Sequence, residues 1–322
     1  MEGTTKATEL VGPPAVEGAQ GPTVPLAAPA GRRGLTDVMR DYLALTKPRI
    51  IVLLLITTVT TMFVADPSGP GLATILWTML GGYLAAGGAG AINHFVDRGR
   101  DARMARTCDR PLVTGRIEPG RGLAFGIALA IGSIALLAAT VNLVAAALAL
   151  TGLLGYVFVY TLWLKPLTPQ NIVIGGAAGA VPPLVGWAAA TGGLTWDALY
   201  PFAIVFLWTP PHFWALALLV KNDYERTGVP MMPVARGDAT TRRQILVYSV
   251  ALIAFTVLPY VTGLFGWLYL ACALALGAGF IGLAADLARR PSRAAAVRLH
   301  LASLAYLALL FAAMAADRIL LG

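Results

Sequence analysis

Three side chains with oxygen donors recur every four residues where a long apolar segment meets a basic loop. They are Asn93, Asp97 and Asp101. In a helix this spacing puts the three side chains on one face, each about one turn from the next. Such oxygens suit Mg2+, which binds few protein carboxylates and completes its coordination with phosphate and water. The spacing therefore predicts a helical face that binds Mg2+ and a diphosphate, with these three residues as metal ligands.

The loop that follows, residues 96–121, contains seven arginines. Guanidinium groups form paired hydrogen bonds with phosphate, and a lysine contributes a point charge. The candidates to neutralise a diphosphate are Lys47, Arg103, Arg106, Arg110 and Lys165. A simpler explanation is that the arginines only set membrane topology and touch anionic lipids. However, Asp97, Asp101 and Asp109 alternate with them, and acidic residues contribute little to topology, which favours the diphosphate site.

A second candidate segment contains His212, Lys221 and Asp223. Asp223 is expected to supply a catalytic carboxylate and metal ligand on the wall opposite Asp97, with Lys221 near the phosphates. An aspartate at a helix end is more often simply solvated, so this prediction depends on its pairing with the first segment. His212 shares the helical face of Asp223, and a histidine inside a membrane either binds something or is satisfied by a backbone carbonyl. The Pro210–Pro211 pair is expected to open or kink the helix.

A third candidate segment, YTLWLKPLTPQN, covers residues 160–171. Lys165 is its only basic residue and is expected to contact phosphate as a point charge. The rings of Tyr156, Tyr160 and Trp163 are candidates to face a developing carbocation. Taken alone, the segment is explained better as an interfacial aromatic belt with a lysine that reaches the headgroups. A catalytic role for Tyr160 and Lys165 therefore depends on the other two segments.

The elements that carry these side chains are predicted to be membrane-spanning helices. The 322 residues are 57% hydrophobic and 12% charged, whereas soluble domains contain about 25% charged residues. Apolar runs of about 17–25 residues are long enough to cross a bilayer as helices. The predicted fold class is therefore an all-α polytopic membrane protein. Its nine spans are expected at residues 46–65, 72–95, 122–140, 142–164, 171–190, 198–220, 245–263, 266–286 and 298–316.

The N-terminal segment is predicted to differ from the rest of the chain. Residues 1–40 are rich in Gly, Pro, Ala and Thr near their start and show no apolar periodicity. Such a composition is typical of a disordered tail, here expected to be cytoplasmic. Residues 41–322 are predicted to form one nine-helix membrane domain.

The distribution of basic residues predicts the orientation. With nine spans, all but one of the 24 lysines and arginines fall on one side, the exception being Arg318. The positive-inside rule then gives a cytoplasmic N-terminus and an outside C-terminus in a bacterial-type inner (plasma) membrane. The net charge of +8 is explained by topology and lipid contact, so no nucleic-acid partner is expected. Cys108 and Cys272 are predicted to lie in different environments, which argues against a disulfide.

The three segments together resemble the UbiA superfamily of intramembrane prenyltransferases over the whole membrane domain. Within it they are most similar to the branch that farnesylates haem. The combination of D-x3-D-x2-M-x-R-T-x2-RPL with HFW…DY…G-x-PM-x-P is more specific than an Asp-rich motif alone. The resemblance is carried by TKPR (46–49), NHFVDRGRDARMARTCDRPLVTGRI (93–117), YTLWLKPLTPQNIVIGGAAGAVPPLVGW (160–187) and PHFWALALLVKNDYERTGVPMMPV (211–234).

This resemblance implies a UbiA-type bundle of nine helices with a central cavity open to the cytoplasmic side. It also implies Mg2+ as cofactor and the transfer of a farnesyl group from farnesyl diphosphate to a vinyl group of haem B, with addition of water, to give haem O. Since the haem is a substrate in this reaction, a tightly held axial ligand is not required, and His212 is a candidate to orient the iron or a propionate. Membrane lipids and haem A synthase are the further partners in this scheme.

Residue by residue, Asn93, Asp97 and Asp101 match the first Asp-rich motif of the superfamily, and Asp223 begins the second. The chain departs from the wider pattern twice. His94 follows Asn93 where an aspartate is common, and position 227 is a threonine where the second motif often repeats its aspartate. The resemblance therefore implies that the first motif carries most of the metal binding.

Two alternative functions stay open. A UbiA-type prenyltransferase with an aromatic or quinone-precursor acceptor would share the metal site and differ only in the acceptor pocket. A secondary transporter would show paired internal repeats and broken helices at the membrane midplane. Nine spans do not divide into two equal halves, and the polar residues gather at helix ends, so the transporter is the weaker alternative.

Overall fold

The structure, a computed structural model, describes residues 34–321, in which the regular elements are all helices and no β-strand occurs. The predicted tail lies outside the described residues up to position 33. Its remaining part differs from the prediction, because α1 (Leu35–Thr46) begins at Leu35 rather than after residue 40. Its sequence LTDVMRDYLALT combines good helix formers with an aspartate in the first turn, where an acidic group is favourable for the helix dipole.

Nine helical segments within residues 34–321 are long and apolar enough to cross a membrane, as predicted. Each apolar run satisfies its backbone hydrogen bonds internally, which a bilayer requires. The fourth span joins α5 (Leu143–Leu154) to a π-helix, η1 (Gly155–Leu164), and to the short α6 (Lys165–Leu167). The other spans are α2 (Pro48–Ala65), α3 (Leu72–Asp101), α4 (Pro119–Thr140), α7 (Asn171–Thr191), α8 (Leu199–Leu219) preceded by η2 (Trp196–Ala198), α11 (Gly237–Val261), α12 (Trp267–Arg289) and α13 (Arg293–Leu321).

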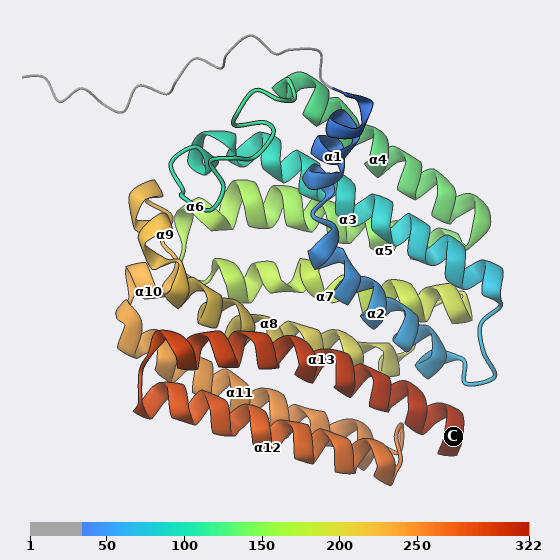
Figure 1. The fold of residues 1–322 in the computed structure, drawn as a ribbon. Coiled ribbons are helices and arrows are strands. Elements are labelled where there is room, and N and C mark those ends of the chain that lie inside the picture. Colours follow the sequence, from blue (N-terminus) through green and yellow to red (C-terminus); the bar gives the residue numbers. More distant parts are fainter. Residues whose placement is uncertain (1–33, 322) are drawn as a thin grey trace, which may run out of the picture. The chain divides into compact units, whose positions relative to one another are not determined.

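The spans pack as one helical bundle (Figure 1). Helix α2 packs against α13, so the first and last spans are neighbours, and it also packs against α7. Helix α8 lies against α7, α11 and α13, and the largest apolar core forms where these helices meet α12. The short helices α6, α9 (Lys221–Thr227) and α10 (Met232–Ala235) gather at one end of the bundle, where α3 also ends.

The prolines inside the spans do not open them. Helix α8 runs without interruption through Pro210 and Pro211, contrary to the expected opening of the helix at this pair. A proline removes one backbone donor, but in a membrane bundle neighbouring helices and hydroxyl side chains compensate for the loss. The two carbonyls that lose their intrahelical donors here are those of Phe206 and Leu207, four residues before each proline.

Close packing of α1 on α3 positions the first basic side chain of the site. Gly90 of α3 has no Cβ, so the backbone carbonyls of Leu45 and Thr46 lie directly over it. The chain then turns at Lys47, whose φ of 57° is left-handed, and Pro48 opens α2. This junction holds the Lys47 side chain beside the next turn of α3.

Candidate active site

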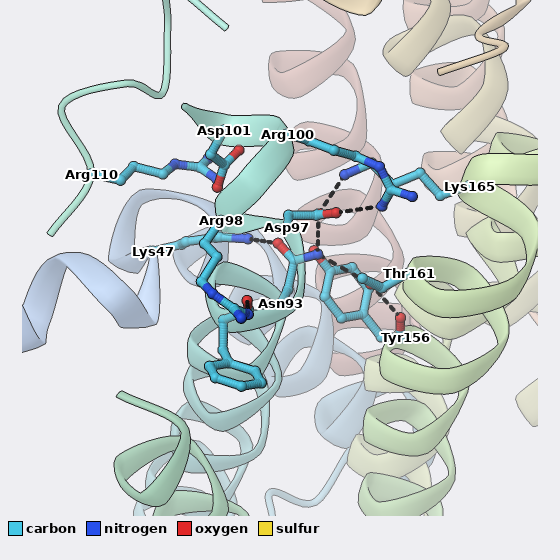
Figure 2. A network of polar contacts seen from close by, with 11 residues as sticks. Lys47, Asn93, Asp97, Arg98, Arg100, Asp101, Arg110, Tyr156, Thr161 and Lys165 are labelled. Atoms are coloured by element: carbon cyan, nitrogen blue, oxygen red, sulfur yellow. Dashed lines mark hydrogen bonds and ion pairs between the residues drawn. The ribbon is translucent and has the colours of Figure 1, made fainter. Parts of the chain in front are cut away.

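The three predicted oxygen-donor side chains share one face of a helix and are buried. Helix α3 continues to Asp101, six residues beyond the predicted span, so Asn93, Asp97 and Asp101 lie on one unbroken helix. All three side chains are buried, with exposed fractions of 4%, 1% and 3%. Figure 2 shows them pointing into a network of polar side chains from α2's N-terminal junction, η1 and the loop after α3.

Asn93 is the centre of this network. Its Oδ1 accepts a hydrogen bond from Nζ of Lys47 at 2.6 Å, and its Nδ2 donates to Asp97 Oδ2 at 2.8 Å. The same Nδ2 lies 3.1 Å from the hydroxyl of Thr161. Since Thr161 donates its own hydrogen to the carbonyl of Tyr156 at 2.8 Å, it accepts from Asn93. These contacts use both ends of the amide and set its orientation.

Each aspartate of the face is paired with basic side chains. Asp97 accepts from Lys165 at 2.5 Å and from Arg100 at 3.0 Å, and Asp101 pairs with Arg110 at 2.6 Å. Buried carboxylates require such partners, because an unpaired charge inside a bundle is strongly unfavourable. The structure thus pairs Lys165 and Arg110, two of the residues predicted to bind the diphosphate, with the carboxylates of this face.

The π-helix η1 brings the aromatic and hydroxyl groups of the site together. Isolated π-turns are rare and occur often at functional sites. The hydrogen bond from Thr161 to Tyr156 spans five residues, which matches the π-helical repeat. The rings of Tyr156 and Tyr160 lie 5.4 Å apart. Trp163, in contrast, is 61% exposed, which agrees with its interpretation as part of an interfacial aromatic belt rather than as a residue that faces the site.

Asp223 in α9 meets the loop that follows α3. Its Oδ1 accepts the backbone N–H of Ala105 at 3.1 Å, so the two predicted segments do come together across the bundle. The neighbouring Tyr224 is buried, and burial raises the pKa of its hydroxyl despite the nearby guanidinium of Arg106. Asp223 thus holds the arginine loop against α9.

The donor set fits a magnesium ion bound together with a ligand rather than a prebuilt metal cage. Within residues 34–321 no three His, Cys, Asp or Glu side chains are grouped to hold a metal ion. The four predicted ligands Asn93, Asp97, Asp101 and Asp223 are nevertheless all oxygen donors, and the first three lie on α3 about one turn apart. Mg2+ commonly binds one or two carboxylates and takes its remaining ligands from phosphates and water.

A cavity of about 330 Å³ lies beside this face at the same end of the bundle. The lining is strongly basic and is formed by Ala44, Lys47, His94, Arg106, Asp109, Arg110, Pro111 and Arg116. Burial, together with repulsion from Arg110 and Lys165, lowers the pKa of Lys47 to about 7. An anionic ligand in the cavity would offset both effects, and Arg106 and Arg110 are placed to contact it.

His94 is a buried polar group of this cavity without a hydrogen bond. Its side chain is 3% exposed, and neither ring nitrogen has a partner among residues 34–321. Buried polar groups in native proteins nearly always have a partner, and both ring nitrogens of His94 are available to a polar group that enters the basic cavity. His94, which stands where an aspartate is common in the superfamily, therefore lines the basic cavity.

Two predicted phosphate-binding residues lie elsewhere. Lys221 pairs with Asp238 at 3.0 Å and with Glu225 at 3.6 Å, and the hydrogen bond to Asp238 raises its pKa. It therefore ties α9 to α11 instead of joining the Asp97 network. Arg103 is exposed and does not line the basic cavity. His212 lies on α8 against α13, in a separate polar group.

A second, apolar cavity of about 650 Å³ lies between α4 and the α5–η1 span, lined by residues such as Ile131 and Phe158. Neither cavity is lined by both Asp97 and Asp223. The central cavity that the resemblance implies between the two motifs therefore stays a prediction.

Sequence reasoning missed two members of the network, Arg100 and Thr161. Arg100 could have been found, because it follows Asp97 by three residues on the same helix, where oppositely charged side chains meet. Thr161 could not, because its contact with Asn93 depends on the π-helical turn of η1 and on how that helix packs against α3.

The model of the UbiA prenyltransferase family matches residues 54–314. The chain belongs to this family. The UbiA relatives include a protoheme IX farnesyltransferase from Roseiflexus sp. (strain RS-1), 50% identical over 92% of this chain. The chain spans only 58% of that relative's length. A protoheme IX farnesyltransferase from Gloeobacter violaceus is also 50% identical, over 89% of this chain and 94% of its own length.

Solved UbiA structures share the fold. A digeranylgeranylglyceryl phosphate synthase superposes with a TM-score of 0.72 at 19% identity, covering 88% of this chain and 99% of that one. A UbiA homolog from Archaeoglobus fulgidus bound to DMAPP and Mg2+ gives a TM-score of 0.62 at 17% identity, covering 85% and 99%. The nine-span arrangement is thus the UbiA fold of an integral membrane protein.

Proposed function

We propose that the protein transfers the farnesyl group of farnesyl diphosphate to a vinyl group of haem B, with addition of water, to give haem O. The observation that carries the proposal is the buried face of Asn93, Asp97 and Asp101 beside the ammonium groups of Lys47 and Lys165. The choice of substrates is supported by the Gloeobacter farnesyltransferase, which the chain matches over 94% of that protein's length.

Asn93, Asp97, Asp101 and Asp223 would hold Mg2+ together with the diphosphate. The A. fulgidus homolog bound to DMAPP and Mg2+ supports this assignment. Bound there, Mg2+ would withdraw charge from the leaving diphosphate. The absence of a three-residue acidic cluster among residues 34–321 is compatible with it, because substrate phosphates supply part of the coordination of Mg2+.

The basic side chains are proposed to bind the diphosphate oxygens. Lys165 and Arg110 pair with Asp97 and Asp101 in the structure, so a cation bound by these carboxylates would free both basic groups for phosphate. Guanidinium groups bind phosphate in a bidentate manner, whereas lysine acts as a point charge. The full set is Lys47, Arg106, Arg110 and Lys165.

The chemical step breaks the allylic C–O bond, leaving diphosphate and a farnesyl cation. Neutralisation of the leaving group in a site that excludes water is the main source of rate enhancement. The rings of Tyr156 and Tyr160 are proposed to stabilise the cation through their π faces. The haem vinyl group then attacks as an alkene, and water adds to the carbon next to the porphyrin ring with release of one proton.

The bundle is proposed to lie in a bacterial inner membrane with the N-terminus in the cytoplasm and the C-terminus outside. The support is the sequence count, in which all but one of the lysines and arginines fall on one side of nine spans. Haem A synthase is the proposed protein partner, since it is expected to take up the product.

The proposal is tested by incubating membranes that contain the protein with haem B, farnesyl diphosphate and Mg2+, followed by mass spectrometry of the pigments. Asp97→Asn is expected to lower farnesyl transfer by about 100- to 1,000-fold. Asp286→Asn is the matched control, because Asp286 is a partly exposed aspartate of α12 that pairs with Arg298 of α13, away from the Asp97 network. Prenylation of an aromatic acid or quinone precursor, with no farnesylated haem, would assign the other acceptor class instead.

A further inference from the structure

A second polar group lies inside the bundle, where α8 faces α13. Nδ1 of His212 is 2.6 Å from the hydroxyl of Ser303, and Nδ1 of His300 is 3.3 Å from the carbonyl of His212. Trp208 donates its indole hydrogen to the carbonyl of Ser303 at 2.8 Å. His212 lies about two turns before the end of α8, and His300 about two turns after the start of α13. The group is therefore inside the same end of the bundle as Asp97.

Counting hydrogens determines the tautomer of His212. The hydroxyl of Ser303 lies 2.6 Å from the carbonyl of His300 as well as 2.6 Å from Nδ1 of His212. Two hydrogen bonds need two hydrogens, and a carbonyl has none to give. The hydroxyl hydrogen goes to the carbonyl, so the second hydrogen must sit on Nδ1 of His212. Its Nε2 therefore carries a free lone pair.

The ring of His212 is also held in one plane. It stacks between Trp208, at a centroid distance of 4.2 Å, and His300, at 4.6 Å. Both histidines are only half-buried, and no hydrogen bond within residues 34–321 occupies Nε2 of His212. A fixed imidazole with Nδ1–H bonded to oxygen and a bare Nε2 is the usual arrangement of a metal-binding histidine.

We infer that Nε2 of His212 is an axial ligand of the haem iron, and that Ser303 and His300 are positioning residues that hold it in this tautomer and plane. The inference rests on the proposed function, which supplies haem as the acceptor. The lone pair fills one axial coordination position of the iron, with no change in oxidation state. Ligation on the α8 wall would orient the porphyrin, leaving a vinyl edge free to face the farnesyl cation.

Ser303 could instead serve only to join two helices, so the test needs a readout at the iron. Ferric haem B alone would be titrated into the full-length protein in detergent, and the optical and electron paramagnetic resonance spectra would be recorded. The wild type is expected to show a histidine-ligated iron. His212→Ala is expected to lose that signature, and added imidazole is expected to restore it.

Ser303→Ala removes the acceptor for Nδ1 and is expected to weaken haem affinity about 10-fold with an altered iron spectrum, whereas Ser303→Thr keeps the hydroxyl and should behave as the wild type. The matched control is Ser249→Ala in α11. Ser249 is equally buried and donates to the carbonyl of Ile245 at 2.7 Å, without a histidine partner. It should leave haem binding unchanged.

Two results would overturn the inference, and they are distinguishable. If His212→Ala keeps the iron spectrum of a wild type that farnesylates haem, the axial ligand is another group and the proposed function stands. If the wild type neither binds nor farnesylates haem, the proposed function fails and the inference fails with it. Equal effects of Ser303→Ala and Ser249→Ala would assign Ser303 a packing role only.

Discussion

At the residue scale, Asp223 makes a structural contact and is also proposed to take part in the chemistry of the site. Its Oδ1 accepts the backbone N–H of Ala105, which docks the arginine loop, and its charge is proposed to contribute to metal binding. The hydrogen bond from the Ala105 N–H needs only an acceptor oxygen on the side chain. Binding of a metal–diphosphate complex, in contrast, is favoured by the full negative charge of a carboxylate. The two roles can therefore be separated by substitution.

Asp223→Asn keeps a side-chain carbonyl for Ala105 and removes the charge. We expect its unfolding temperature to stay near that of the wild type, while farnesyl transfer falls about 100-fold. Asp223→Ala should lose both the docking contact and the activity. An Asn variant with full activity beside an inactive Ala variant would show that Asp223 positions the loop and does not bind metal.

At the scale of elements, α2 and α7 approach each other closely enough to require glycine. A Cβ at Gly186 of α7 would collide with the backbone carbonyl of Thr58 in α2, whereas a Cβ at Gly179 on the same helix would have no atom within 4 Å. Small residues let membrane helices pack at short distances, where dispersion forces dominate. Helix α7 also carries Gly175, which faces the ring of Tyr160, so its packing reaches the site.

Gly186→Ala should lower the free energy of unfolding by roughly 1–3 kcal/mol through overpacking. Gly179→Ala should be neutral or stabilising by up to about 1 kcal/mol, because alanine favours a helix. Thermal unfolding of both variants in the same detergent measures the difference. Equal unfolding temperatures would mean that α2 and α7 are not in close contact.

At the scale of the whole molecule, helices that cross the membrane put the two ends of the bundle in different compartments. Cys108 lies in the loop after α3, at the end that carries the active site, and Cys272 lies near the start of α12 at the opposite end. Both thiols are partly exposed and unpaired in disulfides. The orientation of the protein can therefore be measured by labelling these two native cysteines, without introducing new ones.

In a Cys272→Ser variant, we expect a membrane-impermeant maleimide to label Cys108 in inverted membrane vesicles and not in right-side-out ones. The reason is that the positive-inside rule places the arginine loop in the cytoplasm. In a Cys108→Ser variant, any labelling of Cys272 should show the reverse preference. Labelling of Cys108 from the outside would contradict the proposed orientation.

The sequence by itself determined the features that depend on neighbouring residues. Nine spans follow from the length of each apolar run, and the buried face of Asn93, Asp97 and Asp101 follows from the periodicity of one helix. Local patterns are less accurate at helix ends. Helix α1 begins at Leu35, inside the predicted tail, and α3 extends to Asp101, beyond the predicted end of its span at residue 95.

Only the tertiary structure decided which side chains meet. Thr161 reaches Asn93 through a π-helical turn, Lys47 reaches it through a left-handed junction, and Lys221 turns away to Asp238. Likewise Ser303, ninety-one residues from His212, selects its tautomer. These contacts depend on the rotation and packing of whole helices against one another, which the periodicity of a single helix does not specify.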